Sequence, residues 1–80
     1  MAELKVTDKR VERLGERIRE LRKERGLSQE GLANLTNIDR GYMGTIERGE
    51  RNITLKKLFD ICDALNVQPS EVFDNFDMTS

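Results

Sequence analysis

The chain has 80 residues, enough for one small domain with a single hydrophobic core and too few for two. Apolar residues and charged residues each make up 36% of it, and with one cysteine and no tryptophan the composition excludes a disulfide framework and favours a folded, helix-rich protein. The net charge of −1 conceals a polarised chain, because residues 1–27 carry nine basic and six acidic side chains, whereas residues 58–80 carry five acidic side chains and no basic one.

The first predicted helix runs from residue 7 to residue 25, after a short tail over residues 1–6. Its apolar residues recur at the period of an amphipathic helix: Val11, Leu14, Ile18 and Leu21. Thr7 or Asp8 can cap its first turn, and Gly26 can end it in the left-handed conformation that helix ends commonly need. The many charges on its other face predict a solvated surface.

A second, short helix is predicted over residues 29–35, with Ser28 as its cap. Residues 36–38 then break the helix, and Asn37 is of a type that tolerates a left-handed turn position. The break is short enough to turn the chain into a corner with the next helix.

The third predicted helix runs from its cap, Asp39, to about Arg48, and Gly49 ends it. Met43 and Ile46 are expected to face inward. Five residues are expected on the opposite, exposed face: Arg40, Gly41, Tyr42, Gly44 and Thr45.

Thr54 caps a predicted fourth helix. Its expected inward stripe contains six residues: Leu55, Leu58, Phe59, Ile61, Cys62 and Leu65. Pro69 stands at a first helical position and predicts a short fifth helix over residues 70–74, followed by a tail over residues 75–80. No segment alternates as a strand does, so the predicted fold is all-α, one domain over residues 7–74 with five helices around one core.

The second and third helices form a pair joined by a short turn, the arrangement in which DNA-binding proteins place the second helix in the major groove. Arg40, at the start of the third helix, can bond O6 and N7 of a guanine together. Tyr42 can lay its ring against a thymine methyl or a sugar, and Thr45 can offer a methyl and a hydroxyl to a base edge. Half-buried or plain surface positions for Tyr42 and Thr45 are the alternatives.

Two glycines inside the third helix, Gly41 and Gly44, together oppose helix formation by about 2 kcal/mol. Close approach of the helix backbone to DNA would account for them. Close packing against another helix is the alternative.

Residues that flank the helix pair are candidate phosphate contacts. Ser28 and Gln29 lie in the first turn of the second helix, where free N–H groups and the helix dipole favour an anion. Arg48, Arg51 and Asn52 follow the third helix, where they can reach the flanking strand of the groove. A solvated-loop position is the alternative for Arg48.

Several motifs resemble those of a known family. Leu27-Ser28-Gln29 with Leu32-Ala33, followed by Ile46-Glu47-Arg48-Gly49, resembles the Cro and phage-repressor (XRE-like) type of helix-turn-helix protein, over residues 14–73. The stretches 39–43 and 47–55 look especially like the controller proteins of restriction-modification systems. The resemblance implies a compact lambda-repressor-like domain that acts as a transcriptional regulator on a palindromic operator in double-stranded DNA.

The resemblance also implies roles for individual residues. Base contacts fall on Arg40, Tyr42, Thr45 and Arg51, and phosphate contacts on Gln29, Arg48 and Asn52. In many relatives an arginine late in helix one meets the glutamate of the Ile-Glu-x-Gly pattern, which implies a structural ion pair between Arg22 and Glu47. Gly41 stands where relatives often place a base contact, so the base there would be read through the backbone, through DNA shape, or not at all.

Apolar residues near the carboxyl terminus exceed what a short last helix needs for its own packing: Val67, Val72, Phe73 and Phe76. Because one helix in one groove contacts only a few base pairs, we expect these residues to form the interface of a symmetric homodimer. Its recognition helices would lie about 34 Å apart. RNA polymerase is a further candidate partner.

The sequence has no histidine, no cysteine with a base partner, no clustered metal ligands and no glycine-rich phosphate loop, so neither an enzyme nor a cofactor is expected. It also lacks a membrane span and a secretion signal, and Cys62 is expected to be a buried thiol. We therefore expect a cytoplasmic, nucleoid-associated DNA-binding protein with no membrane partner. The alternative is a protein-interaction module of the same fold, such as an antitoxin-like protein or a repressor antagonist.

Overall fold

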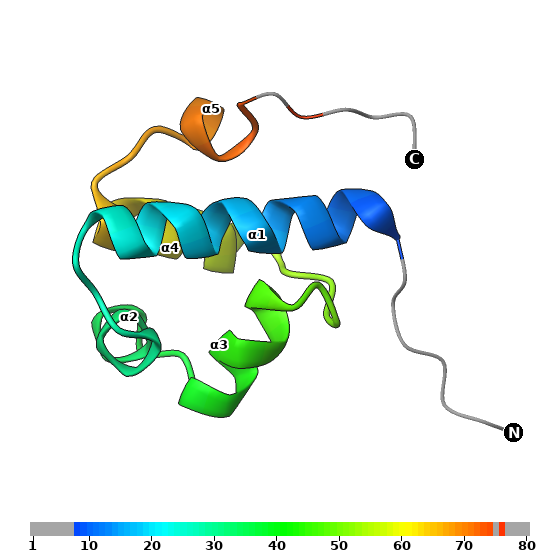
Figure 1. Cartoon of the computed structure of the whole chain (residues 1–80). Helices are drawn as coiled ribbons and strands as arrows, with labels where there is room; N and C mark the ends of the chain where they lie inside the picture. The colour runs from blue at the N-terminus through cyan, green and yellow to red at the C-terminus, as the bar shows by residue number, and fades with distance from the viewer. Residues whose placement is uncertain (1–7, 75, 77–80) are drawn as a thin grey trace, which may run out of the picture.

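The computed structural model describes residues 8–74 and 76 (Figure 1). This part of the chain holds five helices and no strand, which confirms the predicted all-α class: α1 (Lys9–Glu24), α2 (Gln29–Thr36), α3 (Arg40–Glu47), α4 (Leu55–Leu65) and α5 (Pro69–Val72). The expected tails, 1–6 and 75–80, lie outside the described residues except for Phe76. None of the five helices has the length and apolar character that crossing a membrane requires.

The first four helices each begin at a side chain that accepts a hydrogen bond from a first-turn amide, as the sequence predicts: Asp8, Ser28, Asp39 and Thr54. Hydrogen bonds from the Arg10 side chain, at 2.7 and 3.0 Å, hold the pKa of Asp8 at about 2. Left-handed residues follow four helices: Gly26, Asn37 and Gly49, again as predicted, and Asn66 at the end of α4. These local signals fix where the helices start and stop.

The core lies where α1 packs against α3 and α5, and α2 packs against α3 and α4. Figure 1 shows α5 on one side of α1, with α2 and α3 on the other. The largest fully buried side chains come from all five helices: Ile18, Leu21, Leu32, Met43, Ile61, Leu65 and Val72. Burial of each such side chain stabilises the fold by roughly 1.5–3 kcal/mol. Because α2 and α3 contribute to the same core as α1 and α4, the α2–α3 corner is held by that core.

Two glycines bring α1 and the end of α3 into backbone contact. A Cβ at Gly15 would lie 2.5 Å from the carbonyl oxygen of Ile46 and 2.6 Å from that of Glu47. A Cβ at Gly49, where φ is +74°, would lie 2.6 Å from Cα of Glu12. Any side chain at either position would push the two helices apart, so these glycines set the distance between α1 and α3.

The inward face of α4 is narrower than predicted. Leu58, Ile61, Cys62 and Leu65 are buried, but Leu55 and Phe59 are 69% and 48% exposed, so their expected inward orientation is wrong. The buried positions follow a narrow three- and four-residue repeat, which turns residues 55 and 59 to the edge of that stripe and into solvent. Cys62 is a buried free thiol, as predicted, and burial raises its pKa.

The fifth helix differs from its prediction at both ends, because it spans Pro69–Val72 rather than residues 70–74. Pro69 itself is helical, as its fixed φ favours at a first position. At the other end, Phe73 leaves helical geometry and the amide of Asp74 donates to the carbonyl oxygen of Glu71, only three residues back. Arg17 on α1 donates to that same carbonyl oxygen at 2.8 Å, which fastens α5 to α1.

Candidate nucleic-acid interface

Helix α3 presents one exposed face at the α2–α3 corner. Arg40 and Gly41 are exposed, and Tyr42 and Thr45 are half-buried, whereas Met43, Gly44, Ile46 and Glu47 are buried. The turn that carries α3 depends on Asn37, which is left-handed at φ 60°. The predicted outward residues of α3 therefore lie on one face, with Gly44 as the exception.

Gly44 packs against α2 and does not belong to the exposed face. A Cβ there would lie 3.3 Å from Oε1 of Gln29 and 3.2 Å from an Nη of Arg48. Its expected outward position is wrong, and close packing against another helix accounts for this glycine. Gly41 differs, because a Cβ there would approach only a carboxylate oxygen of Asp39, at 3.1 Å. Packing within the described chain does not require glycine at position 41.

A buried polar network joins α1, α2 and α3 behind this face. Arg22 and Glu47, 7% and 6% exposed, form two hydrogen bonds: Nε to Oε2 at 2.7 Å and Nη2 to Oε1 at 3.0 Å. Nη1 of Arg22 also donates to the carbonyl oxygen of Leu27 at 2.8 Å, and Nε2 of Gln29 donates to Oε1 of Glu47 at 3.0 Å. Each buried charge thus has several partners, which is the condition under which a buried ion pair is tolerated.

The network changes what Gln29 can offer. One of its amide hydrogens is committed to Glu47, so the other remains for a phosphate. Ser28 is exposed, and its Oγ accepts from the amide of Gly31 at 2.9 Å as the helix cap. Arg48 is exposed and pairs with Glu50 at 3.1 Å. The candidate phosphate contacts at the start of α2 and the end of α3 therefore reach the surface, but all three already have protein partners.

A small cleft of about 250 Å³ opens beside this network, lined by Arg19, Arg22, Gln29, Glu47 and Arg48. Arg19 comes from α1 and is exposed. Sequence reasoning assigned it to a solvated charged surface. Its position one turn before Arg22, on the same side of α1, is the signal that could have placed it beside α2.

On the other flank of α3, Tyr42 has two cationic neighbours. The guanidinium carbon of Arg51 lies 5.4 Å from the centre of its ring, and Nζ of Lys57 lies 5.5 Å from it. The ring also packs against the core, in agreement with the half-buried alternative. Lys57 was missed by sequence reasoning, because its contact with Tyr42 spans two helices.

The side chains of Thr45 and Arg40 differ in whether they already form hydrogen bonds within the described chain. The hydroxyl of Thr45 donates to the carbonyl oxygen of Tyr42 at 2.6 Å, so it can only accept from a base. The guanidinium of Arg40, by contrast, has no hydrogen bond or ion pair with any residue of the described chain. Asn52 and Arg51 are likewise exposed, in the loop beyond α3.

The expected dimer residues divide into two groups. Val67 and Val72 are 8% and 1% exposed and belong to the core, so their expected place in an interface is wrong. The packing of α5 on α1 and α4, which spacing alone does not reveal, buries Val72. Phe73 is 41% exposed and makes an edge-to-face contact with Phe76, at 5.3 Å between ring centres.

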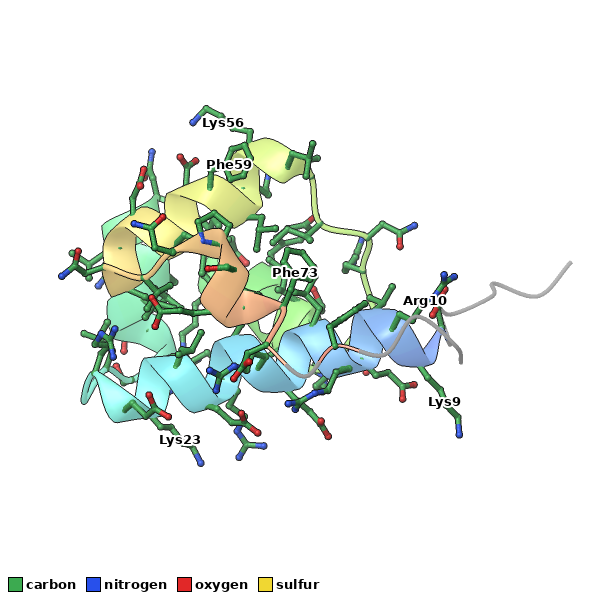
Figure 2. All side chains as sticks on the ribbon, turned by 90° about the horizontal axis from the view of Figure 1, so that it is seen from above. Lys9, Arg10, Lys23, Lys56, Phe59 and Phe73 are labelled. Carbon is green, nitrogen blue, oxygen red and sulfur yellow. The ribbon has the colours of Figure 1, made fainter. Side chains whose placement is uncertain are left out.

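Two further large apolar side chains are exposed on α4, Leu55 and, one turn later, Phe59. Figure 2, which views the side that carries α5, shows Phe59 on α4 and Phe73 close to α5. The described residues contain no group of three or more metal-ligating side chains.

Comparisons with known proteins agree with this geometry. The control protein C.SmaI of Serratia marcescens is 46% identical over 53 residues, which are 66% of this chain and 63% of that protein. The crystal structure of the restriction-modification controller protein C.AhdI from Aeromonas hydrophila has a TM-score of 0.80 and 44% identity, over 82% of this chain and all of that one.

A second solved structure is the controller protein C.Esp1396I, as a tetramer in complex with its natural 35 base-pair operator. It has a TM-score of 0.77 and 35% identity, over 86% of this chain and 91% of that one. A family model described as helix-turn-helix matches residues 18–72, which include α2, α3 and α4. The chain therefore belongs to the HTH_3 helix-turn-helix family.

Proposed function

We propose that this chain is a transcriptional regulator that binds a specific, palindromic sequence of double-stranded DNA as a homodimer, in the manner of a restriction-modification controller protein. The observation that carries the proposal is the division of α3. Its inner half is held by the Arg22–Glu47–Gln29 network, and its outer face presents the guanidinium of Arg40, which bonds to no described residue. Recognition in the major groove needs a rigidly held helix with a side chain near its start that is available to contact a base.

The charge distribution supports this orientation. Arg19 and Arg48 flank α3 on one side, and Arg51 and Lys57 flank it on the other. The acidic residues after position 58 belong to α4, α5 and the residues that follow them. Helix α5 lies across α1 from α2 and α3 (Figure 1), so α3 would meet the phosphate backbone with cations on both sides.

For the homodimer, the structure shifts the proposed contacts away from Val67 and Val72. Exposed Phe73 with Phe76, together with Leu55 and Phe59, supplies the apolar surface in their place. A symmetric pairing through this surface would leave α3 of each protomer free, since α5 and α3 lie on opposite sides of α1. RNA polymerase remains a candidate partner of the DNA-bound form.

Selection of bound sequences from a random duplex pool tests the whole proposal. We expect a palindromic site whose half-sites lie about one helical turn, roughly 10 base pairs, apart between centres. Affinity for that site should fall steeply with salt, because each phosphate contact releases counterions. Selection of no preferred sequence, with binding that is flat in salt, would contradict the proposal and favour a protein-interaction module.

A further inference from the structure

The ring of Tyr42 is contacted by cations from two separate elements. Arg51 belongs to the loop between α3 and α4, whereas Lys57 stands in the first turn of α4. Their cationic groups lie 5.4 and 5.5 Å from the ring centre. At such distances a cation is attracted by the electrons of the ring face. Tyr42 is therefore tied to α4 as well as to its own helix.

The two cations differ in how they are anchored. Arg51 is exposed and stands in a non-helical loop. Lys57 is half-buried, its backbone amide donates to the Thr54 cap at 3.1 Å, and its neighbour Leu58 is 3% exposed in the core. Because Arg51 stands in an exposed loop, its guanidinium is free to leave the ring and reach a base in the groove. Lys57 can keep its contact, because the helix start that carries it is fixed.

We propose that Lys57 is a positioning residue for DNA reading, which holds the ring of Tyr42 from α4 while Arg51 is engaged with DNA. This inference rests on the proposed function of α3. The burial of Lys57 favours this role over a simple phosphate contact. Its neighbour Lys56 behaves in the opposite way, since its side chain is 81% exposed, pairs with Asp60 at 3.0 Å and points away from the molecule in Figure 2.

Lys56 and Lys57 provide a matched pair of substitutions. Lys57→Met removes the charge that touches Tyr42, and Lys56→Met removes the same charge one residue earlier without touching the ring. We expect Lys57→Met to weaken binding to the selected operator about two- to fivefold, the range that an exposed cation–π contact supports. Binding to a scrambled duplex should change as little as it does in Lys56→Met. Lys57→Arg, which keeps a cation, should restore the discrimination.

A double substitution separates positioning from direct contact. In a Tyr42→Leu background, Lys57→Met should have no further effect on operator affinity, because the ring that it holds is gone. The salt dependence of binding should also be the same for Lys57→Met and the unaltered chain. Equal losses on operator and scrambled DNA, with a salt slope reduced by about one, would make Lys57 a phosphate contact and overturn the inference.

The ring contact can also be measured without DNA. Tyr42 is the only tyrosine and the chain has no tryptophan, so ultraviolet-excited tyrosine fluorescence reports this one ring. Acrylamide should quench it more strongly in Lys57→Met than in Lys56→Met or the unaltered chain. Identical quenching in Lys57→Met, Lys56→Met and the unaltered chain would overturn the proposed role of Lys57 but would leave the proposed DNA-binding function untouched. An unaltered chain that binds no duplex would instead overturn the proposed function, and with it the role of Lys57 in DNA reading.

Discussion

The two halves of α3, a helix of eight residues, differ in how strongly the rest of the protein holds them. The inner, carboxyl-terminal half is fixed by side-chain contacts: Glu47 bonds to Arg22 of α1 and Gln29 of α2, and Gly44 lies against the side chain of Gln29. The outer, amino-terminal half begins with Arg40, whose guanidinium has no hydrogen bond or ion pair with any described residue. It continues with Gly41, where a Cβ would meet only a carboxylate oxygen of Asp39, at 3.1 Å. The difference shows that the rigidity of this corner comes from buried contacts with α1 and α2, and not from the residues on the exposed face of α3. It also predicts that stability and DNA binding can be broken separately.

The largest effect is expected from Glu47→Ala. This substitution leaves the guanidinium of Arg22 buried without its carboxylate partner and should lower the free energy of unfolding by about 3–5 kcal/mol. Urea unfolding followed by circular dichroism, at one fixed protein concentration, measures it. Glu24→Ala on the exposed part of α1 is the control and should change stability by less than about 0.5 kcal/mol. Equal effects of the two substitutions would show that the network does not hold the corner.

Gly15→Ala should disturb the packing of the inner half of α3 against α1 through a steric clash alone. Its Cβ would meet the carbonyl oxygens of Ile46 and Glu47, which are main-chain atoms and cannot rotate away. Overpacking of this kind should lower the free energy of unfolding by about 1–3 kcal/mol, even though alanine is the better helix former. The same urea titration detects it. A more stable Gly15→Ala variant would mean that α1 and α3 do not touch at this point in solution.

Arg40→Ala tests the outer half. It should cost about 1–3 kcal/mol of binding free energy on the selected operator and relax discrimination at one base pair, because a bidentate contact to guanine is lost. The midpoint of urea unfolding should stay the same, since the guanidinium of Arg40 has no hydrogen bond or ion pair to lose among residues 8–74 and 76. Titration of operator and scrambled duplexes measures both affinities. Equal losses on the two sequences would reassign Arg40 to the phosphate backbone.

The smallest effect, and the sharpest one for the comparison, is expected from Gly41→Ala. A methyl group at position 41 would lie 3.1 Å from a carboxylate oxygen of Asp39, the end of a flexible side chain that can shift by a few tenths of an ångström. Alanine should therefore raise the free energy of unfolding by up to about 1 kcal/mol through helix propensity. If the helix backbone approaches DNA here, the same variant should bind the operator more weakly. A variant that is more stable and binds equally well would remove close approach as the reason for Gly41.

Much of this architecture could be read from local chemistry. Ser28, Asp39 and Thr54 cap helices, and Asn37 turns the corner, because each acts within four residues of its own position. The orientation of Gly44 could not be read in that way. A helix of eight residues with two glycines offers too few side chains for its apolar period to fix which face is buried.

The remaining differences concern contacts between distant segments. Val72 is buried because α5 packs on α1, and Lys57 reaches Tyr42 because α4 starts beside α3. Neither contact can be predicted from the spacing of residues along the sequence. The Arg22–Glu47 pair was expected only from the family resemblance, since its two residues lie on different helices.

The backbone contact at Gly15 also couples the position of α1 to that of α3, the helix proposed to face DNA. Lys23 is exposed on α1 and extends away from the body of the molecule in Figure 2. A spin label attached there would move with α3, because no flexible side chain separates the two helices at their closest approach. In the proposed dimer, the distance between two such labels would therefore follow the separation of the two α3 helices, with and without the operator.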